Sequence, residues 1–247
     1  QEYLNKINVF PVPDGDTGTN MAFTLTSILD STANTIHPRA DDMLALFADS
    51  ALDGARGNSG VILAQFFQGL SDGAAGVEKM TPENFAKAVQ FGAEYARQAL
   101  AEPIEGTILT VLTDFSNHLI ELIESQYYDF EHLLIEGINE AEKSLENTPN
   151  LLAVLKKAGV VDAGAQGFVD LLHGILSFVK DGNLREFNTA IETEKITLDP
   201  IKTESSFENF EFRYCTECLI NGENIDHKKI REALQVNGSS VIFSVSL

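Results

Sequence analysis

Two aspartates near the start of the chain, Asp14 and Asp16, are the residues best suited to bind a metal ion. They lie in the segment Pro13-Asp14-Gly15-Asp16-Thr17-Gly18-Thr19-Asn20, which combines two carboxylates with hydroxyl and amide side chains. Side chains two residues apart in an extended or tightly turned segment can project to one side, where the repulsion between carboxylates favours a bound cation. The segment therefore has the composition that a metal–phosphate site requires.

The residues around this acid pair determine where a helix can begin. Pro11 and Pro13 exclude a helix through the residue between them. Gly15 and Gly18 permit backbone dihedral angles that a side chain would forbid. We therefore expect a helix to begin just after the acid pair. Its first residues offer capping groups and free backbone N–H donors that suit an anion, and they are Thr17, Thr19 and Asn20.

Several other functions share letters with this segment, and the sequence argues against them. Asp16-Thr17-Gly18 matches the triplet of aspartic proteases, but no second copy exists in the chain. A calcium loop that starts at Asp14 would need Gly and Glu where Thr19 and Leu25 stand. No Gly-Lys pair occurs, so a Walker A loop is absent. Taken alone, however, Pro-Asp-Gly-Asp is also well explained as an ordinary solvated turn.

A second glycine-rich segment, Gly54-Ala55-Arg56-Gly57-Asn58-Ser59-Gly60, directly precedes the apolar run from Val61 to Leu70. Such a turn at a helix N-terminus suits a phosphate cradle, with Asn58 and Ser59 as donors. An ordinary glycine-rich loop between helices explains the segment about as well. The segment supports a phosphate site only in combination with other turns.

Two further turns also stand where apolar helices are expected to begin. In Glu105-Gly106-Thr107, the threonine is most simply an N-cap residue and secondarily a ligand residue. In the segment 160–167, an acid and a glycine turn precede a helix, and Asp162 is again most simply an N-cap. If the four helix starts meet at one rim of a bundle, they form a site.

Helices must position these turns, and the sequence from Met21 to about Ala190 has helical periodicity almost throughout. An apolar stripe predicts a helix over 167–180, and a stripe of small residues predicts one over 85–100, with Thr81 as N-cap. Proline and glycine interrupt the pattern at Pro38, 73–76, Pro82, Pro103, Pro149 and Gly159. The sequence therefore predicts a mainly α protein, an antiparallel helical bundle with short loops.

The C-terminal part of the chain has a different pattern. We predict a helical domain over 1–191, a linker over 192–208 that is rich in Thr, Glu and Ser, and a partial small α/β domain over 209–247. Strands are expected over 210–215 and 240–245, with a helix over 226–234. We expect the chain to be a fragment that lacks sequence at both ends.

Composition excludes several classes of partner. The 247 residues carry a formal net charge of -20, which argues against nucleic acid and anionic membranes. The chain would have to hold a polyphosphate with few cations of its own, and divalent metal on aspartates together with backbone N–H dipoles would make this possible. Cys215 and Cys218 lack a second pair, so we expect neither a disulfide framework nor a four-cysteine zinc site. The longest apolar run is too short to span a bilayer, and we expect a cytoplasmic protein.

Four segments in this order closely resemble the nucleotide-binding domain shared by dihydroxyacetone kinases and the ATP-binding subunit of bacterial fatty acid kinases, called the DhaL-like domain. The segments are NVFPVPDGDTGTNM, GARGNSGVILAQ, EGTIL and LKKAGVVDAGAQGF. The resemblance covers about residues 1–190. The Asn-Val-Phe-Pro-Val-Pro opening and the later Tyr214-Cys215-Thr216-Glu217 are similar to the fatty acid kinase branch. Residues 206–247 resemble the beginning of the middle domain of that branch.

The resemblance implies an antiparallel helical barrel that binds ATP through two Mg²⁺ ions. It implies that Asp14 and Asp16 are the metal ligands and have the catalytic role, with Asn8 as the nearest oxygen-bearing candidate for a third ligand. Contacts to phosphate are implied for Thr17, Gly18, Thr19, Asn20, Gly57, Asn58, Ser59 and Gly60. Positions bordering adenine and ribose are implied for Thr107, Asp162, Ala163 and Gly164.

The function that the resemblance implies is transfer of the γ-phosphoryl group of ATP to a fatty acid, giving an acyl phosphate. The fatty acid would be presented by a separate acyl-binding protein, and the arrangement also allows a homodimer. Two alternatives stay open at this point. The chain could be a dihydroxyacetone-type kinase, or a non-catalytic module that holds ADP–Mg and recognises a partner.

Overall fold

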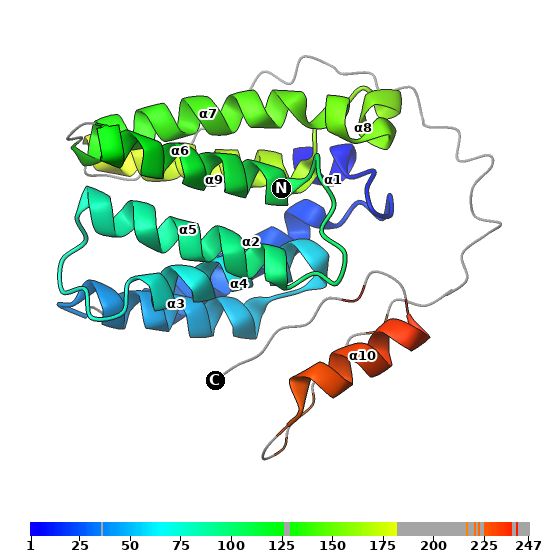
Figure 1. Cartoon of the computed structure of the whole chain (residues 1–247), viewed down its shortest axis with the longest axis horizontal. Helices are drawn as coiled ribbons and strands as arrows, with labels where there is room; N and C mark the ends of the chain where they lie inside the picture. The colour runs from blue at the N-terminus through cyan, green and yellow to red at the C-terminus, as the bar shows by residue number, and fades with distance from the viewer. Residues whose placement is uncertain are drawn as a thin grey trace.

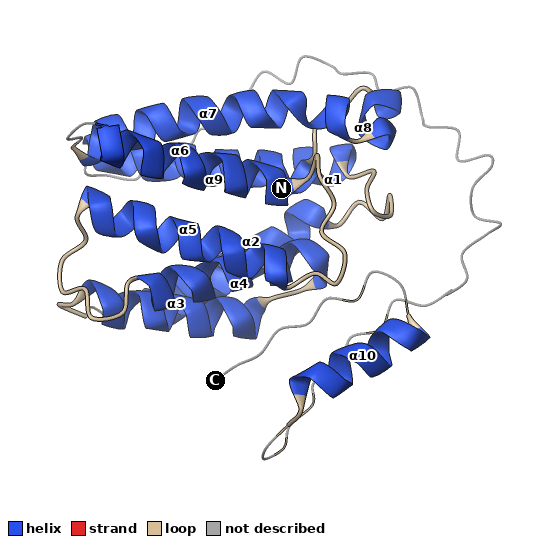
Figure 2. Cartoon of the chain, in the orientation of Figure 1, coloured by secondary structure: helices blue, strands red, loops and turns tan. Residues whose placement is uncertain are grey.

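The structure is a computed structural model, and it describes residues 1–35, 37–125, 129–181, 216, 220, 222, 225–238 and 241. The described residues form helices and no strand (Figure 2). This confirms the prediction of a mainly α bundle. The strands predicted over 210–215 and 240–245, the linker and both cysteines lie outside the described residues, Val241 excepted.

Ten helices are present in the described residues, and the chain order gives their bounds. They are α1 Glu2–Ile7, α2 Thr17–Thr32, α3 Ala40–Gly54, α4 Gly57–Gly73, α5 Pro82–Gln98, α6 Ile108–Ser125, α7 Phe130–Leu151, α8 Ala153–Ala158, α9 Ala163–Asp181 and α10 His227–Asn237. Helix α10 confirms the helix predicted near 226–234. Helix α1 was not predicted.

Successive helices run antiparallel and pack on one another from α2 to α7, and α9 contacts both α7 and α2. The contacts therefore close into a ring. Figure 1 shows α6, α7 and α9 in one layer and α2, α3, α4 and α5 in the other. Because the direction alternates, α2, α4, α6 and α9 all begin at the same end of the bundle, the right side of Figure 1. Helices α1 and α8 lie at this end.

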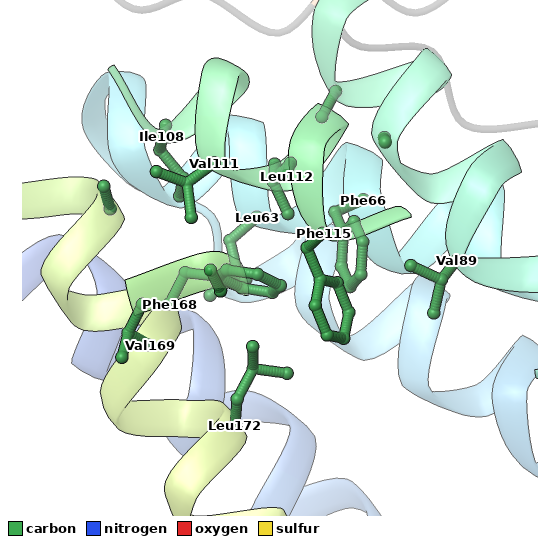
Figure 3. Close-up of a cluster of buried hydrophobic side chains, with 14 of the residues drawn as sticks. Leu63, Phe66, Val89, Ile108, Val111, Leu112, Phe115, Phe168, Val169 and Leu172 are labelled. Atoms are coloured by element: carbon green, nitrogen blue, oxygen red, sulfur yellow. The ribbon is translucent and has the colours of Figure 1, made fainter. Parts of the chain in front are cut away.

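Aromatic side chains from three helices meet in the core between the layers (Figure 3). Phe168 of α9 packs edge-on against Phe66 of α4 and Phe115 of α6, with ring centroids 5.5 and 5.6 Å apart. All three are buried. Burying a side chain of this size stabilises the fold by about 1.5–3 kcal/mol. The core thus joins the helices whose first turns carry the predicted site.

Small residues on the inner face of helix α5 allow α4 to pack closely against it. Its N-cap is Thr81, whose side chain accepts a hydrogen bond from the Asn84 N–H, as predicted. A Cβ on Gly92 would come within 2.8 Å of the Phe66 ring, so only glycine allows α4 to approach this closely.

Within the described residues, no helix is both long and apolar enough to cross a bilayer.

Candidate functional site

The opening turn has no helical structure between the end of α1 and Thr17, as the two prolines require. The Asp14 N–H donates to the Val12 carbonyl, with 2.9 Å between the two atoms. Gly15 has a φ of 70°, a left-handed conformation that disfavours a side chain. Helix α2 then begins at Thr17, directly after the acid pair, as predicted.

The acid pair itself is arranged as a site for positive charge. The carboxyl group of Asp16 lies close enough to Asp14 to affect its pKa. Burial, and then the neighbouring charge of Asp16, raise the pKa of Asp14 above its ordinary value. Two carboxylates held this close repel one another, and a cation between them would remove the repulsion.

Asn8 is the third member of this cluster. Its side chain is 5% exposed, and its Nδ2 donates to Asp14 Oδ1 over 2.7 Å. Its Oδ1 is buried and has no hydrogen-bond partner among the described residues. A buried acceptor without a donor costs free energy, about 1–3 kcal/mol, unless a ligand satisfies it. This unsatisfied oxygen beside the acid pair is the observation that most directly points to a bound cation.

The donor set fits Mg²⁺. All three side chains offer oxygen, and Mg²⁺ prefers oxygen ligands, usually one or two carboxylates plus phosphates and water. No group of three or more His, Cys, Asp or Glu residues that could hold a metal occurs in the described part of the chain. The two acids would therefore need Asn8 and ligand phosphates to complete the coordination shell.

Helix α1 packs on the first turn of α2 and supports it. Asn5 Oδ1 accepts from the Thr19 N–H, and Asn5 Nδ2 donates to Thr19 Oγ1, over 3.1 and 2.9 Å. Gly18 is helical and does not have a positive φ, so it does not use the dihedral freedom that glycine permits. Its role is steric, because a Cβ there would overlap with the Gln1 carbonyl and lie 2.9 Å from Leu4 Cβ.

The glycine-rich turn lies beside the opening turn, as the site requires. Gly57 has a φ of 56°, and a Cβ on it would overlap with the Asn20 side chain of α2. Ser59 Oγ lies 3.5 Å from the Thr17 carbonyl oxygen. Helix α4 begins at Gly57, so the segment 57–60 is the first helical turn rather than the loop that the sequence indicated. The first turns of α2 and α4 are thus in contact.

The Thr107 turn forms the start of α6. Thr107 Oγ1 donates to the Ile104 carbonyl over 2.8 Å and accepts from the Leu109 N–H over 3.4 Å, which agrees with its capping position. Glu105 accepts from Thr110 Oγ1 and pairs with Arg97 of α5. These bonds lower the pKa of Glu105, the bond from Thr110 contributing most. Glu105 therefore serves to fix the loop.

Asp162 caps the N-terminus of α9, and this is the simpler of the two roles that the sequence suggested for it. Its Oδ1 accepts from the Ala165 N–H over 2.9 Å, and the nearby backbone of Ile108 and Gly164 also lowers the pKa of the carboxyl group. The side chain is 6% exposed, and burial raises its pKa to about 6. Ala163 and Gly164 are buried beside it. A Cβ on Gly164 would lie 3.3 Å from Ile108 Cβ, so the starts of α6 and α9 are adjacent.

Sequence reasoning missed two residues that organise this end of the bundle, Asn5 and Thr148. Asn5 belongs to the short helix α1, which has no strong periodic signal. Thr148 is fully buried near the end of α7 and directly precedes Pro149. A threonine before a proline inside a helix was the available signal, because its hydroxyl can replace the missing proline N–H.

Comparison with known proteins identifies similar sequences. Residues 11–177 match the model of the DAK2 domain. The chain is 36% identical to an uncharacterized protein of Staphylococcus epidermidis and 36% identical to one of Staphylococcus saprophyticus. It is 35% identical to an uncharacterized protein of Staphylococcus aureus. Each match covers 98% of this chain and 45% of the relative, so the chain spans less than half the length of these relatives.

Proposed function

The chain belongs to the DAK2 domain family, a family of kinase-type ATP-binding modules, and we propose that it is the ATP- and Mg²⁺-binding part of a fatty acid kinase. The observation that carries the metal part of this proposal is the buried Asn8 Oδ1, which has no partner among the described residues and lies beside Asp14. The closed ring of helices supports a barrel with ATP at the end where α2, α4, α6 and α9 begin.

In this proposal Asp14, Asp16 and Asn8 hold Mg²⁺, and the first turns of α2 and α4 hold the phosphates. Backbone N–H groups at helix starts suit anions because the helix dipole adds partial positive charge there. Thr19 Oγ1 accepts from Asn5 and Gln1, which leaves its own O–H to donate to a phosphate oxygen. The phosphate-contacting residues are Thr17, Gly18, Thr19, Asn20, Gly57, Asn58, Ser59 and Gly60.

Thr107, Ala163 and Gly164 border adenine and ribose in this proposal, because they lie at the starts of α6 and α9. Asp14, Asp16 and Asn8 would hold Mg²⁺, which would supply positive charge against the charge that develops during phosphoryl transfer. The protein's own residues then have two tasks. They orient the phosphates on fixed N–H groups, and they hold the carboxylates of the acid pair at the place where the cation binds.

The acyl substrate is the finer part of the proposal, and sequence similarity is its support. The segment 8–13 and the residues Tyr214-Cys215-Thr216-Glu217 are similar to the fatty acid kinase branch. We propose that an acyl-binding protein presents the fatty acid in the cytoplasm, and that the carboxylate of the fatty acid attacks the γ-phosphorus. An acyl phosphate and ADP are the products.

A reconstituted assay tests this proposal. The full chain is incubated with ATP, Mg²⁺, a fatty acid and a candidate acyl-binding protein, and acyl phosphate is measured. Product that appears only when the binding protein is present supports the proposal. Phosphorylation of dihydroxyacetone instead would assign the other kinase activity, and tight ADP binding with no product would assign a non-catalytic module. Either of these results would contradict the fatty acid kinase assignment.

A further inference from the structure

Pro149 leaves a carbonyl group near the end of α7 without its helical donor. In a helix the N–H of residue 149 would donate to the carbonyl of Leu145, but proline has no N–H. The structure fills this gap locally, because Thr148 Oγ1 donates to the Leu145 carbonyl over 2.7 Å. Thr148 is 0% exposed, so water does not compete for these groups.

The same Thr148 hydroxyl also contacts another element. Its Oγ1 accepts from the Asp162 N–H over 3.2 Å, which ties the end of α7 to the turn before α9. The Thr148 carbonyl accepts from Leu152, and a Cβ on Gly106 would lie 3.0 Å from that carbonyl oxygen. The loop before α6 therefore packs on the same point.

Asp162 continues the connection to two helix starts. Its carboxylate accepts from Ala165 in the first turn of α9. The same turn packs on the start of α6, because a Cβ on Gly164 would lie 3.3 Å from the Cβ of Ile108, the first residue of α6. A carboxylate buried in this way is costly even when it is hydrogen-bonded, and such costs are concentrated at functional positions. The end of α7 and the starts of α6 and α9 lie together at the right side of Figure 1.

We propose that Thr148 and Asp162 form a buried clamp that positions the first turns of α6 and α9 for the adenosine part of the nucleotide. Both are positioning residues, and Asp162 acts through the backbone rather than by touching the nucleotide. The inference rests on the proposed ATP site, since it assigns the clamp to the nucleoside end and the acid pair to the phosphate end. The two ends can therefore be separated by a ligand that has phosphates and no adenosine.

The test compares Mg–ATP with Mg–tripolyphosphate binding to the full chain by isothermal titration calorimetry. We expect Thr148→Val to weaken Mg–ATP binding about tenfold, because the first turns of α6 and α9 would no longer be held in place. The affinity for Mg–tripolyphosphate should change by less than about twofold. Thr148→Ser keeps the hydroxyl and should restore Mg–ATP binding. Equal weakening of both ligands, or unchanged Mg–ATP binding, would overturn the clamp.

A second variant keeps the test valid if Thr148→Val folds poorly. In Thr148→Val/Pro149→Ala the new N–H at residue 149 can donate to the Leu145 carbonyl, so stability recovers while the bond to Asp162 stays broken. The matched control is Thr113→Val, because the Thr113 hydroxyl donates only to Leu109 of its own helix. Thr113→Val should leave the ratio of the affinities for Mg–ATP and Mg–tripolyphosphate unchanged.

Hydrogen exchange separates failure of the clamp from failure of the proposed function. If the parent binds neither ligand, the ATP site is wrong and the positioning role falls with it. The clamp itself predicts that Thr148→Val speeds amide exchange at Asp162, Ile108 and Ala165 without any ligand present. Unchanged exchange at these amides would contradict the clamp, whatever the parent binds.

Discussion

At the scale of single residues, Asn8 is the side chain that most clearly sets the charge of the site. It donates one hydrogen bond to Asp14 and leaves its buried oxygen without a partner among the described residues. An aspartate at this position would add a third carboxylate to a pair in which burial and mutual repulsion already raise the pKa of Asp14. In the proposed metal site, an asparagine at position 8 would offer an oxygen ligand without adding a third negative charge.

We predict that Asn8→Asp lowers the free energy of unfolding without metal by about 1–2 kcal/mol and that Mg²⁺ restores it. Thermal unfolding with and without Mg²⁺ measures this, and the variant should show a larger Mg²⁺-induced rise in Tm than the parent. Asn34→Asp is the control, because the substitution adds the same charge at an exposed position beyond the end of α2. Equal Mg²⁺-induced shifts in the two variants would argue against metal binding at Asn8.

Asp162 makes stability depend on pH. Burial raises its pKa from 3.8 to about 6, so the folded state binds this proton more tightly than the unfolded state. The ionised carboxylate therefore lowers the free energy of unfolding above about pH 6, by about 3 kcal/mol at neutral pH. The free energy of unfolding rises again as the pH falls from about 6 towards 4, because the carboxylate becomes protonated.

Urea unfolding at two pH values checks this sign. Between about pH 7 and pH 5, the unfolding free energy of the parent should change by about 1 kcal/mol in the stabilising direction, relative to Asp162→Asn. The comparison with the variant removes the contribution of other titrating groups. Identical changes in parent and variant would mean that the carboxylate is not desolvated.

The sequence was a good guide to residues whose roles are local. The acid pair, the start of α2 and the caps Thr81 and Asp162 follow from proline, glycine and capping chemistry within a few positions. Asn5 and Thr148 could not be found in this way. Their partners lie 14 residues away in the chain, and only packing brings them together.

At the scale of elements, the contact between α1 and α2 positions the first turn of α2, where we propose that phosphate binds. Gly18 lies under α1, where any side chain would meet Gln1 and Leu4. We predict that Gly18→Ala lowers the free energy of unfolding by about 1–3 kcal/mol, because α1 must move. Chemical denaturation measures the loss, and amide exchange in α1 should become faster.

Gly174→Ala is the matched control for this helical glycine. No atom lies within 4 Å of a Cβ at Gly174 in α9, so the alanine should stabilise the helix by about 0.5–1 kcal/mol. If Gly18→Ala stabilised the protein in the same way, the close packing of α1 on α2 would be wrong.

Helix positions were largely predictable from the sequence, and the exceptions have physical reasons. Pro149 was expected to break a helix, but α7 continues to Leu151 because the Thr148 hydroxyl satisfies the carbonyl that proline leaves unpaired. The glycine-rich segment 57–60 was expected to be a loop. It is helical because the contact of Gly57 with Asn20 and the packing of α4 on α2 outweigh low helix propensity.

At the scale of the whole molecule, the proposed function poses an electrostatic problem. A chain with a formal net charge of -20 would have to hold a polyphosphate, and the bundle brings four helix starts to one end. The predicted antiparallel bundle with short loops allowed these starts to share an end. Which starts touch could not be predicted, because contacts such as Asn20 with Gly57 depend on the packing of helices distant in sequence.

The most direct test of the account is calorimetric titration of the full chain with ATP, in the presence and absence of Mg²⁺. We predict binding that requires Mg²⁺, and its loss by at least about a hundredfold in Asp14→Asn and Asp16→Asn, because each removes a metal-binding charge. Circular dichroism should show unchanged helicity in both variants. Binding of Mg–ATP to both variants with the affinity of the parent would contradict the assignment of the acid pair to the metal.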